Sequence, residues 1–106
     1  MIAMNSELFN KYTVEGELPV LVEFWAPWCG YCRRIGPAFD QIGERYAGRL
    51  VTAKVNIDEE PALASREMIE VIPTLVLYRK GQALGSIVAP ESKARIESFI
   101  RETLGA

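Results

Sequence analysis

Apolar segments typical of buried strands alternate along the chain with segments whose apolar residues have helical spacing. Residues 18–26 are almost all apolar and rich in valine and aromatic side chains, which predicts a strand buried on both faces. Residues 50–57 form a second predicted strand. Between them, residues 29–47 place apolar side chains at helical spacing: Ile35, Phe39, Ile42 and Tyr46. The pattern therefore predicts a helix that connects two buried strands.

Similar patterns flank this central unit. Apolar residues recur at helical spacing behind Ser6, which predicts a helix over residues 6–13 with Ser6 as its N-cap. Residues 58–61 are three acids followed by a proline, which is typical of a helix start. Residues 74–78 and 83–88 are two further strands, joined by a tight turn at Lys80-Gly81. A last helix carries the apolar side chains Ile96, Phe99, Ile100 and Leu104.

The order of these elements predicts the fold class. Strands joined through helices pair in parallel by crossover, and the turn at Gly81 predicts an antiparallel hairpin. We therefore expect an α/β protein with a mixed central β-sheet flanked by helices on both faces. With 106 residues, the chain fits one domain spanning residues 1–106.

Charge and composition narrow the function classes. Twelve basic against fourteen acidic residues give a net charge of −2, which argues against a nucleic-acid or anionic-membrane surface. Histidine is absent, which excludes Ser-His-Asp and Cys-His catalysis and histidine-bound metals. The first residues lack an export signal, and no apolar run reaches the roughly 18–20 residues that span a bilayer. We expect a cytoplasmic protein.

The strongest chemical signal is the pair Cys29 and Cys32, the two cysteines of the chain. A reducing compartment favours a reactive role over a structural one, and no second pair completes a four-sulfur metal site. At a helix N-terminus, unpaired N–H groups stabilise a thiolate on Cys29. Residues one turn apart lie within disulfide distance. We expect Cys29 to be the nucleophile and Cys32 the shielded, resolving thiol.

Three segments resemble the thioredoxin family. Residues 22–32 (Val-Glu-Phe-Trp-Ala-Pro-Trp-Cys-Gly-Tyr-Cys) resemble its active-site strand and turn. Residues 53–58 (Ala-Lys-Val-Asn-Ile-Asp) are similar to its next strand, and residues 72–74 (Ile-Pro-Thr) to its cis-proline signature. The resemblance implies the thioredoxin fold and a dithiol–disulfide oxidoreductase that reduces protein disulfides without a cofactor of its own. It also implies a monomer recharged by a thioredoxin reductase, commonly a flavoprotein.

The resemblance implies roles for a buried acid and a lysine. Glu23 interrupts the apolar strand, and burial there raises the pKa of a carboxyl group. In the family this acid and a lysine of the neighbouring strand, here Lys54, lie below the second sulfur, and the acid helps take its proton. The alternative for Glu23 is a solvent-facing acid at the sheet edge.

The resemblance further implies a client-binding groove beside the cysteines. Trp28 resembles the family's exposed indole, with a half-buried packing residue as the alternative. Pro73 is expected to follow Ile72 through a cis bond, rather than as an ordinary trans proline. The Ile72 backbone then pairs with an extended client segment. Gly30 also belongs to this groove.

Three residues depart from the family pattern. Tyr31 stands where thioredoxins usually have proline, Glu23 where they have aspartate, and Ala89 where a glycine lines the groove. We expect Tyr31 to be solvated, with its backbone N–H directed at the Cys29 sulfur. That bond favours the thiolate and predicts a weaker reductant than a proline-containing thioredoxin. The alternative is that the phenol ring covers Cys29 and strips water from its thiolate, which would act in the opposite direction. Ala89 adds a methyl group where glycine allows close approach.

Three other functions stay open at this point. A binding module would keep the apolar pattern without needing both cysteines. An oxidase or isomerase would use the same pair but requires export. Some glutaredoxins with Tyr between their cysteines bridge an iron–sulfur cluster, although glutathione-site motifs are lacking here.

Overall fold

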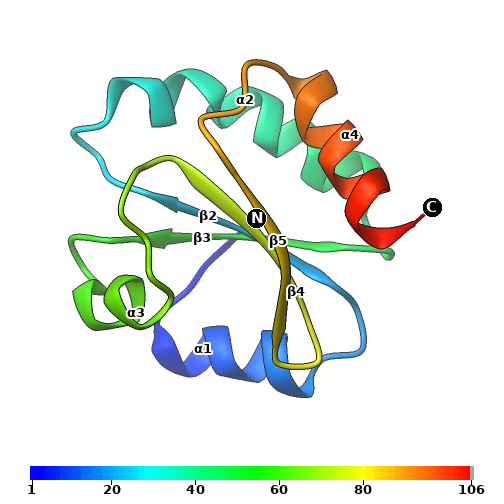
Figure 1. Ribbon diagram of the computed structural model, residues 1–106, viewed down its shortest axis with the longest axis horizontal. Coiled ribbons are helices and arrows are strands. Elements are labelled where there is room, and N and C mark those ends of the chain that lie inside the picture. Colours follow the sequence, from blue (N-terminus) through cyan, green and yellow to red (C-terminus); the bar gives the residue numbers. More distant parts are fainter. Residues whose placement is uncertain (106) are drawn as a thin grey trace.

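In a computed structural model that describes residues 1–105, a five-stranded sheet lies between two layers of helices (Figure 1). Helices α2 and α4 cover one face of the sheet, and α1 and α3 cover the other. The elements in chain order are β1 (Ile2–Ala3), α1 (Ser6–Asn10), a π-helical turn η1 (Lys11–Glu15), β2 (Val20–Trp25), α2 (Gly30–Arg45), β3 (Val51–Asn56), α3 (Pro61–Arg66), β4 (Thr74–Arg79), β5 (Gln82–Val88) and α4 (Lys93–Leu104).

The sheet is mixed, which confirms the predicted architecture. Its strand order is β1-β3-β2-β4-β5. Strand β3 pairs in parallel with β1 and β2, whereas β4 is antiparallel to both β2 and β5. The sequence pattern missed β1, because a strand of two residues is too short to show a period of two. Its pairing of Ile2 with Ala53 is visible only in the fold.

The central strand β2 separates two hydrophobic cores. Val22 and Phe24 point toward the core under α1 and α3, whereas Leu21 points toward the core under α2 and α4. All three side chains are fully buried, which confirms the predicted burial of both faces of this strand. Because its side chains alternate between the cores, Glu23 shares the α2 side with Leu21. This alternation brings a carboxyl group under the helix that carries the cysteines.

Two local details differ from the sequence prediction. The N-cap of α1 is Asn5, whose Oδ1 accepts a hydrogen bond from the Leu8 N–H at 2.9 Å, so the prediction of Ser6 was wrong by one residue. Both residue types cap helices well, and the pattern alone does not choose between neighbours. The helix predicted over residues 6–13 is also divided, with α1 passing into the π-helical turn at Lys11.

The predicted hairpin turn is confirmed. Lys80 and Gly81 have φ angles of 50° and 80°, as a two-residue turn between twisted strands requires. The Gly81 N–H donates a hydrogen bond to the Thr13 carbonyl at 2.7 Å. The β4–β5 hairpin is therefore tied to the first helical segment, and it carries the two loops that border the cysteines.

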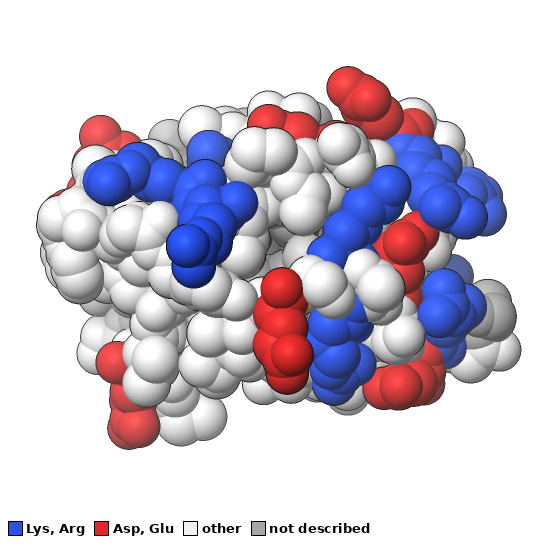
Figure 2. Space-filling view, turned by 90° about the horizontal axis from the view of Figure 1, so that it is seen from above, with Lys and Arg blue, Asp and Glu red and all other residues white. Residues whose placement is uncertain are grey.

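Surface charges of both signs are mixed on the helical face. Figure 2 shows the side formed by α2 and α4, where acidic side chains lie among the basic ones. None of the helices within residues 1–105 is long and apolar enough to span a bilayer.

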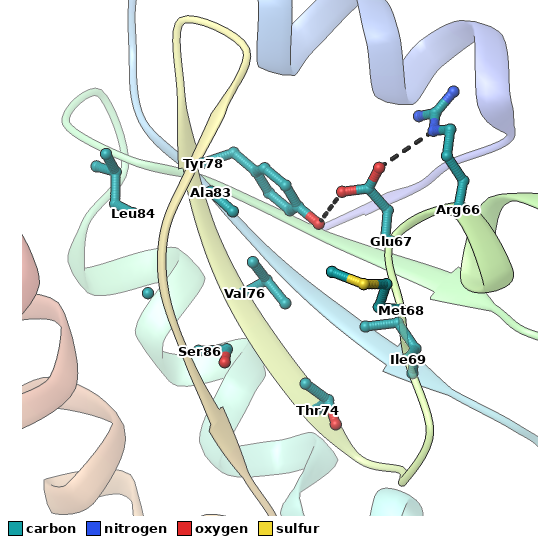
Figure 3. A pocket seen from close by; sticks show the side chains of 11 residues that line it. Arg66, Glu67, Met68, Ile69, Thr74, Val76, Tyr78, Ala83, Leu84 and Ser86 are labelled. Atoms are coloured by element: carbon teal, nitrogen blue, oxygen red, sulfur yellow. Dashed lines mark hydrogen bonds and ion pairs between the residues drawn. The ribbon is translucent and has the colours of Figure 1, made fainter.

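A hollow of about 440 Å³ opens between β5 and the segment that connects α3 to β4 (Figure 3). At its edge, Tyr78 Oη donates a hydrogen bond to Glu67 Oε1 at 2.7 Å, and Arg66 pairs with Glu67 at 3.1 Å. Burial and the Glu67 carboxylate keep the pKa of Tyr78 above its usual range, so the phenol stays protonated. These contacts fasten the connecting segment to the sheet, and neither cysteine lines the hollow.

Candidate active site

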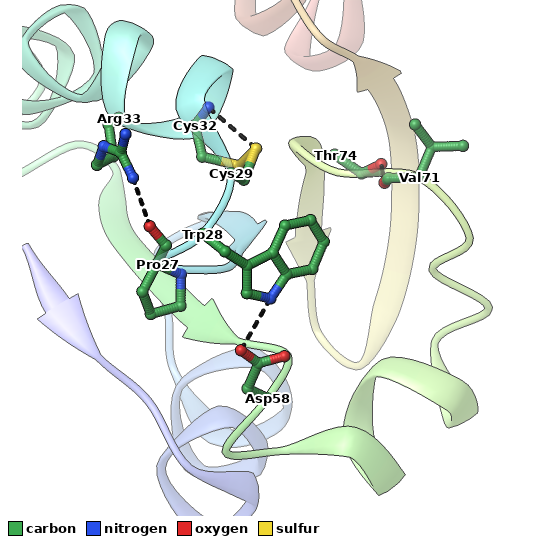
Figure 4. The surroundings of a disulfide bond; sticks show 8 residues. All are labelled: Pro27, Trp28, Cys29, Cys32, Arg33, Asp58, Val71 and Thr74. Carbon is green, nitrogen blue, oxygen red and sulfur yellow. Dashed lines mark hydrogen bonds between the residues drawn. A yellow bond between two sulfur atoms is a disulfide. The ribbon is translucent and has the colours of Figure 1, made fainter.

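The two cysteines lie where β2 gives way to α2 (Figure 4). Cys29 is the N-cap residue of α2, and Cys32 lies one turn further along the helix. A disulfide joins them, with their Cα atoms 5.3 Å apart. The backbone N–H of Cys29 donates to the Ala26 carbonyl at 3.1 Å, which fixes the turn between strand and helix. The predicted redox pair is therefore assembled at a helix N-terminus.

The Cys29 sulfur serves as the cap of α2. The backbone N–H of Cys32 donates a hydrogen bond to Cys29 Sγ at 3.2 Å. Donors at a helix N-terminus stabilise negative charge, so this geometry favours a thiolate on Cys29 after reduction. We expected the donor to be Tyr31, and for the disulfide form that was wrong. The side chain of an N-cap residue reaches across the first turn, here to Cys32.

The two sulfur-bearing residues differ in accessibility. Cys29 is 9% exposed and Cys32 is 3% exposed, and Ala26 is fully buried beside them. Both residues are therefore buried, and Cys29, at the end of the helix, keeps the larger accessible fraction. Cys32 is shielded one turn behind it.

The loop before β4 faces the cysteine pair. The bond between Ile72 and Pro73 is cis, as expected. Ile72 packs against the cluster formed by Ala26, Cys29 and Cys32. This loop therefore lies beside the disulfide.

Trp28 is exposed, as expected, with 66% of its surface accessible. Its Nε1 donates a hydrogen bond to Asp58 Oδ2 at 3.0 Å, as Figure 4 shows. Nearby, Arg33 Nη1 donates to the Pro27 carbonyl at 2.6 Å, which ties down the turn before Cys29. The indole is an apolar platform held in one orientation by a carboxylate on the neighbouring β3 side.

Glu23 is buried on the α2 side of the sheet with only 2% of its surface exposed, so it is not an edge acid. Among the described residues, its Oε2 has no hydrogen-bond partner. Burial raises the pKa of Glu23 from 4.5 to about 7, with the charge of Asp40 acting in the same direction and that of Lys54 opposing it. The Lys54 ammonium lies over the Trp25 ring, 4.5 Å from its centre. A buried carboxyl group that titrates near neutrality thus lies beneath the helix of the cysteines.

Tyr31 is half-buried rather than solvated, which corrects our expectation. Its Oη donates a hydrogen bond to the Pro90 carbonyl at 2.8 Å, and its ring packs against both the cysteine cluster and the core under α2. Ala89 has a φ of 44°, in the region that favours glycine, and its N–H donates to the Pro73 carbonyl at 2.8 Å. Tyr31, which departs from the family pattern, is therefore hydrogen-bonded to the loop after β5. The same loop contains Ala89, a second residue that departs from the pattern.

Three residues make contacts near the site that the sequence pattern did not predict. Asp58 holds Trp28, Pro90 accepts the bond from Tyr31, and Trp25 lies under Lys54. Only Asp58 carries a usable signal, since it follows a strand parallel to β2, and the carboxyl ends of neighbouring parallel strands meet at one edge. The contact at Pro90 is 59 residues distant from Tyr31 and has no local signature.

The reactive side chains of the site are those of a dithiol site. Within the described residues, no group of three or more His, Cys, Asp or Glu side chains is arranged to hold a metal ion. The arrangement offers one sulfur at the helix N-cap, a second sulfur one turn behind it and one buried acid, which suits thiol–disulfide exchange.

Comparisons with known proteins agree with this chemistry. The thioredoxin family model matches residues 1–102. Thioredoxin 1 of Synechococcus elongatus is 37% identical over 102 residues, covering 96% of this chain and 95% of that protein. Thioredoxin of Synechocystis sp. is 41% identical over 96 residues, covering 91% and 90%. The chloroplastic M-type thioredoxin of Chlamydomonas reinhardtii is 39% identical over 102 residues, covering 96% and 73%. This protein therefore belongs to the thioredoxin family and is a thiol–disulfide oxidoreductase of the protein-disulfide reductase type.

Proposed function

We propose that Cys29 attacks client disulfides and that Cys32 completes the exchange. The Cys29 thiolate displaces one client sulfur as a thiolate and forms a mixed disulfide with the other. The Cys32 thiolate then attacks Cys29 Sγ, which releases the second client sulfur and leaves the Cys29–Cys32 disulfide. Two electrons pass from the dithiol to the client. The observation that carries this assignment is the N-cap position of Cys29, whose sulfur accepts the Cys32 N–H, with Cys32 more deeply buried one turn behind it.

We propose Glu23 as the group that takes the proton of Cys32. The acid must be ionised part of the time near neutral pH, and its pKa of about 7 supports this. Lys54 is paired with Glu23 in the β2–β3 register, and its charge lowers the carboxyl pKa that burial raises. Lys54 is therefore assigned the role of keeping Glu23 titratable.

We propose that clients dock in a groove around Cys29. Trp28 supplies its apolar side, and the backbone at Ile72 and Pro73 pairs with an extended client segment. Gly30 supports this placement, since a Cβ built there would meet no atom within 4 Å and the space beside it is open. Ala89 and Tyr31 form the opposite side of the groove.

The partners follow from this chemistry. We propose that a flavoprotein thioredoxin reductase recharges the disulfide, that no cofactor is bound, and that residues 1–106 act as one domain and as a monomer in the cytoplasm. The mixed charges of the α2–α4 side support the absence of nucleic-acid and membrane partners (Figure 2).

An insulin-disulfide reduction assay tests the two thiol roles. We expect Cys29→Ser to abolish turnover. Cys32→Ser should instead accumulate a mixed disulfide between Cys29 and the client, visible by non-reducing electrophoresis and mass spectrometry. Full activity of Cys29→Ser, or trapping through Cys32, would refute the assignment. Iron content after anaerobic purification distinguishes the cluster-bridging alternative.

A further inference from the structure

Two loops and the first turn of α2 meet beside the disulfide, and two hydrogen bonds join them. The Ala89 N–H donates to the carbonyl of Pro73, which links the loop after β5 to the cis-proline loop. Tyr31 Oη donates to the carbonyl of Pro90, which links the same loop to the first turn of α2. Both donor–acceptor distances are 2.8 Å. The loop after β5 is therefore held from both sides of the cysteine pair.

The loop held in this way is strained. Ala89 has a φ of 44°, and residues with a Cβ adopt this region at a cost. The following Pro90 adds to the restriction, because a residue before proline favours extended backbone. A strained conformation of this kind persists only where its surroundings over-determine it. The bonds from Tyr31 and to Pro73 supply that restraint.

Tyr31 is suited to hold the loop because it is itself fixed. Its ring is half-buried and packs against Cys29, Cys32 and the core under α2. Pro90, its hydrogen-bond acceptor, is buried. The phenol oxygen thus connects two packed elements across the rim of the groove, while a proline at position 31 has no group that reaches Pro90.

We propose, on the basis of the function assigned above, that Tyr31 is a positioning residue that favours polypeptide disulfides over small ones. Its hydroxyl holds Ala89 and Pro90 as a preformed wall of the groove. An extended client segment lies along that wall, and a preformed wall lowers the ordering cost of docking. A small disulfide needs access only to the Cys29 sulfur and gains little from the wall.

The experiment compares Tyr31→Phe with the parent protein, using insulin and the small disulfide 2-hydroxyethyl disulfide as probes. We expect the ratio of kcat/KM for insulin to that for the small disulfide to fall about five-fold, the factor that one neutral hydrogen bond is worth. The loss should appear in KM for insulin rather than in kcat. Tyr46→Phe, at the other end of α2, is the matched control and should keep the parent ratio.

A second substitution tests the strained wall directly. Glycine adopts positive φ without the steric cost, so Ala89→Gly in the Tyr31→Phe background should restore the ratio toward the parent value. An unchanged ratio in Tyr31→Phe, an equal loss in Tyr46→Phe or no restoration by glycine would overturn the proposal. In each of those cases the proposed function still stands if the unmodified protein reduces insulin through Cys29. An unmodified protein that does not reduce insulin would overturn both the proposed function and the role of Tyr31.

Discussion

Glu23 and Lys54 are paired residues on neighbouring parallel strands, yet the Lys54 ammonium lies over the Trp25 ring, and Glu23 Oε2 has no hydrogen-bond partner within residues 1–105. The lysine charge lowers the carboxyl pKa, but burial outweighs it, and the pKa of Glu23 rises to about 7. The carboxyl group therefore changes charge in the pH range where thiols exchange. Two predictions depend on this relationship.

Glu23→Gln should slow the release of the client from its mixed disulfide. We expect a loss on the order of 100-fold at pH 8, since a positioned base typically contributes about 10²–10⁴-fold. The attack by Cys29 should change less. In the parent, the release rate should rise with a midpoint near pH 7 as Glu23 ionises, and this step should vanish in the variant. Rapid-quench kinetics with a labelled client measures both steps. Glu44→Gln, an exposed acid on α2, is the control, and equal release rates in parent and Glu23→Gln across pH 6–8 would refute the role.

Folding stability should also depend on Glu23. Its pKa is higher in the folded protein than the ordinary 4.5, so the folded state binds the proton more tightly, and stability falls as pH rises from about 4.5 through about 7. The difference between the two pKa values corresponds to about 3 kcal/mol. Glu23→Gln removes this loss, so its stability advantage over the parent should grow by about 3 kcal/mol between pH 4 and pH 8. Urea unfolding of the oxidised proteins measures it, and a constant difference would contradict the prediction.

Ala89→Gly should stabilise the protein. The left-handed backbone at Ala89 costs about 1–2 kcal/mol, and glycine adopts it freely. The greater freedom of glycine in the unfolded chain offsets part of the gain, so we expect about 0.5–1 kcal/mol. The control is Ala83→Gly in the extended strand β5, which should destabilise by up to about 1 kcal/mol. Thermal or urea unfolding compares the two, and destabilisation by Ala89→Gly would show that the loop is not strained.

Tyr31→Pro should make the protein more reducing. The backbone N–H at position 31 lies in the first turn of α2, where N–H groups have no intrahelical acceptor. We expect it to stabilise a thiolate on Cys29 in the reduced form, although the Cys32 N–H is the donor in the disulfide form. Proline lacks this donor, which destabilises the reduced form. Tyr31→Phe keeps the N–H and should keep the parent potential. Equilibration against a glutathione series measures all three, and a proline variant that is equally or less reducing would contradict this account.

Several features followed from short stretches of sequence. The buried strand before the cysteines, the helix after them and the hairpin at Gly81 each carry their pattern within a few consecutive residues. The cysteine spacing likewise predicted a disulfide, because one helical turn brings the two side chains together. The burial of Glu23 was predictable because an acid within an apolar strand has neighbours on both faces.

The features of the site that the sequence did not predict depend on contacts between residues distant in the chain. Tyr31 is hydrogen-bonded to Pro90 across 59 positions, and its side chain is half-buried where we expected it to be solvated. The left-handed backbone of Ala89 is tied to Pro73, and the place of Lys54 over Trp25 arises because β3 lies beside β2. By itself, the sequence determined the reaction class and the cysteine pair that forms the disulfide, since both depend on residues within one helical turn. The tertiary structure decided how the groove is walled and which groups surround the buried acid, because packing selects among contacts that local patterns leave equally open.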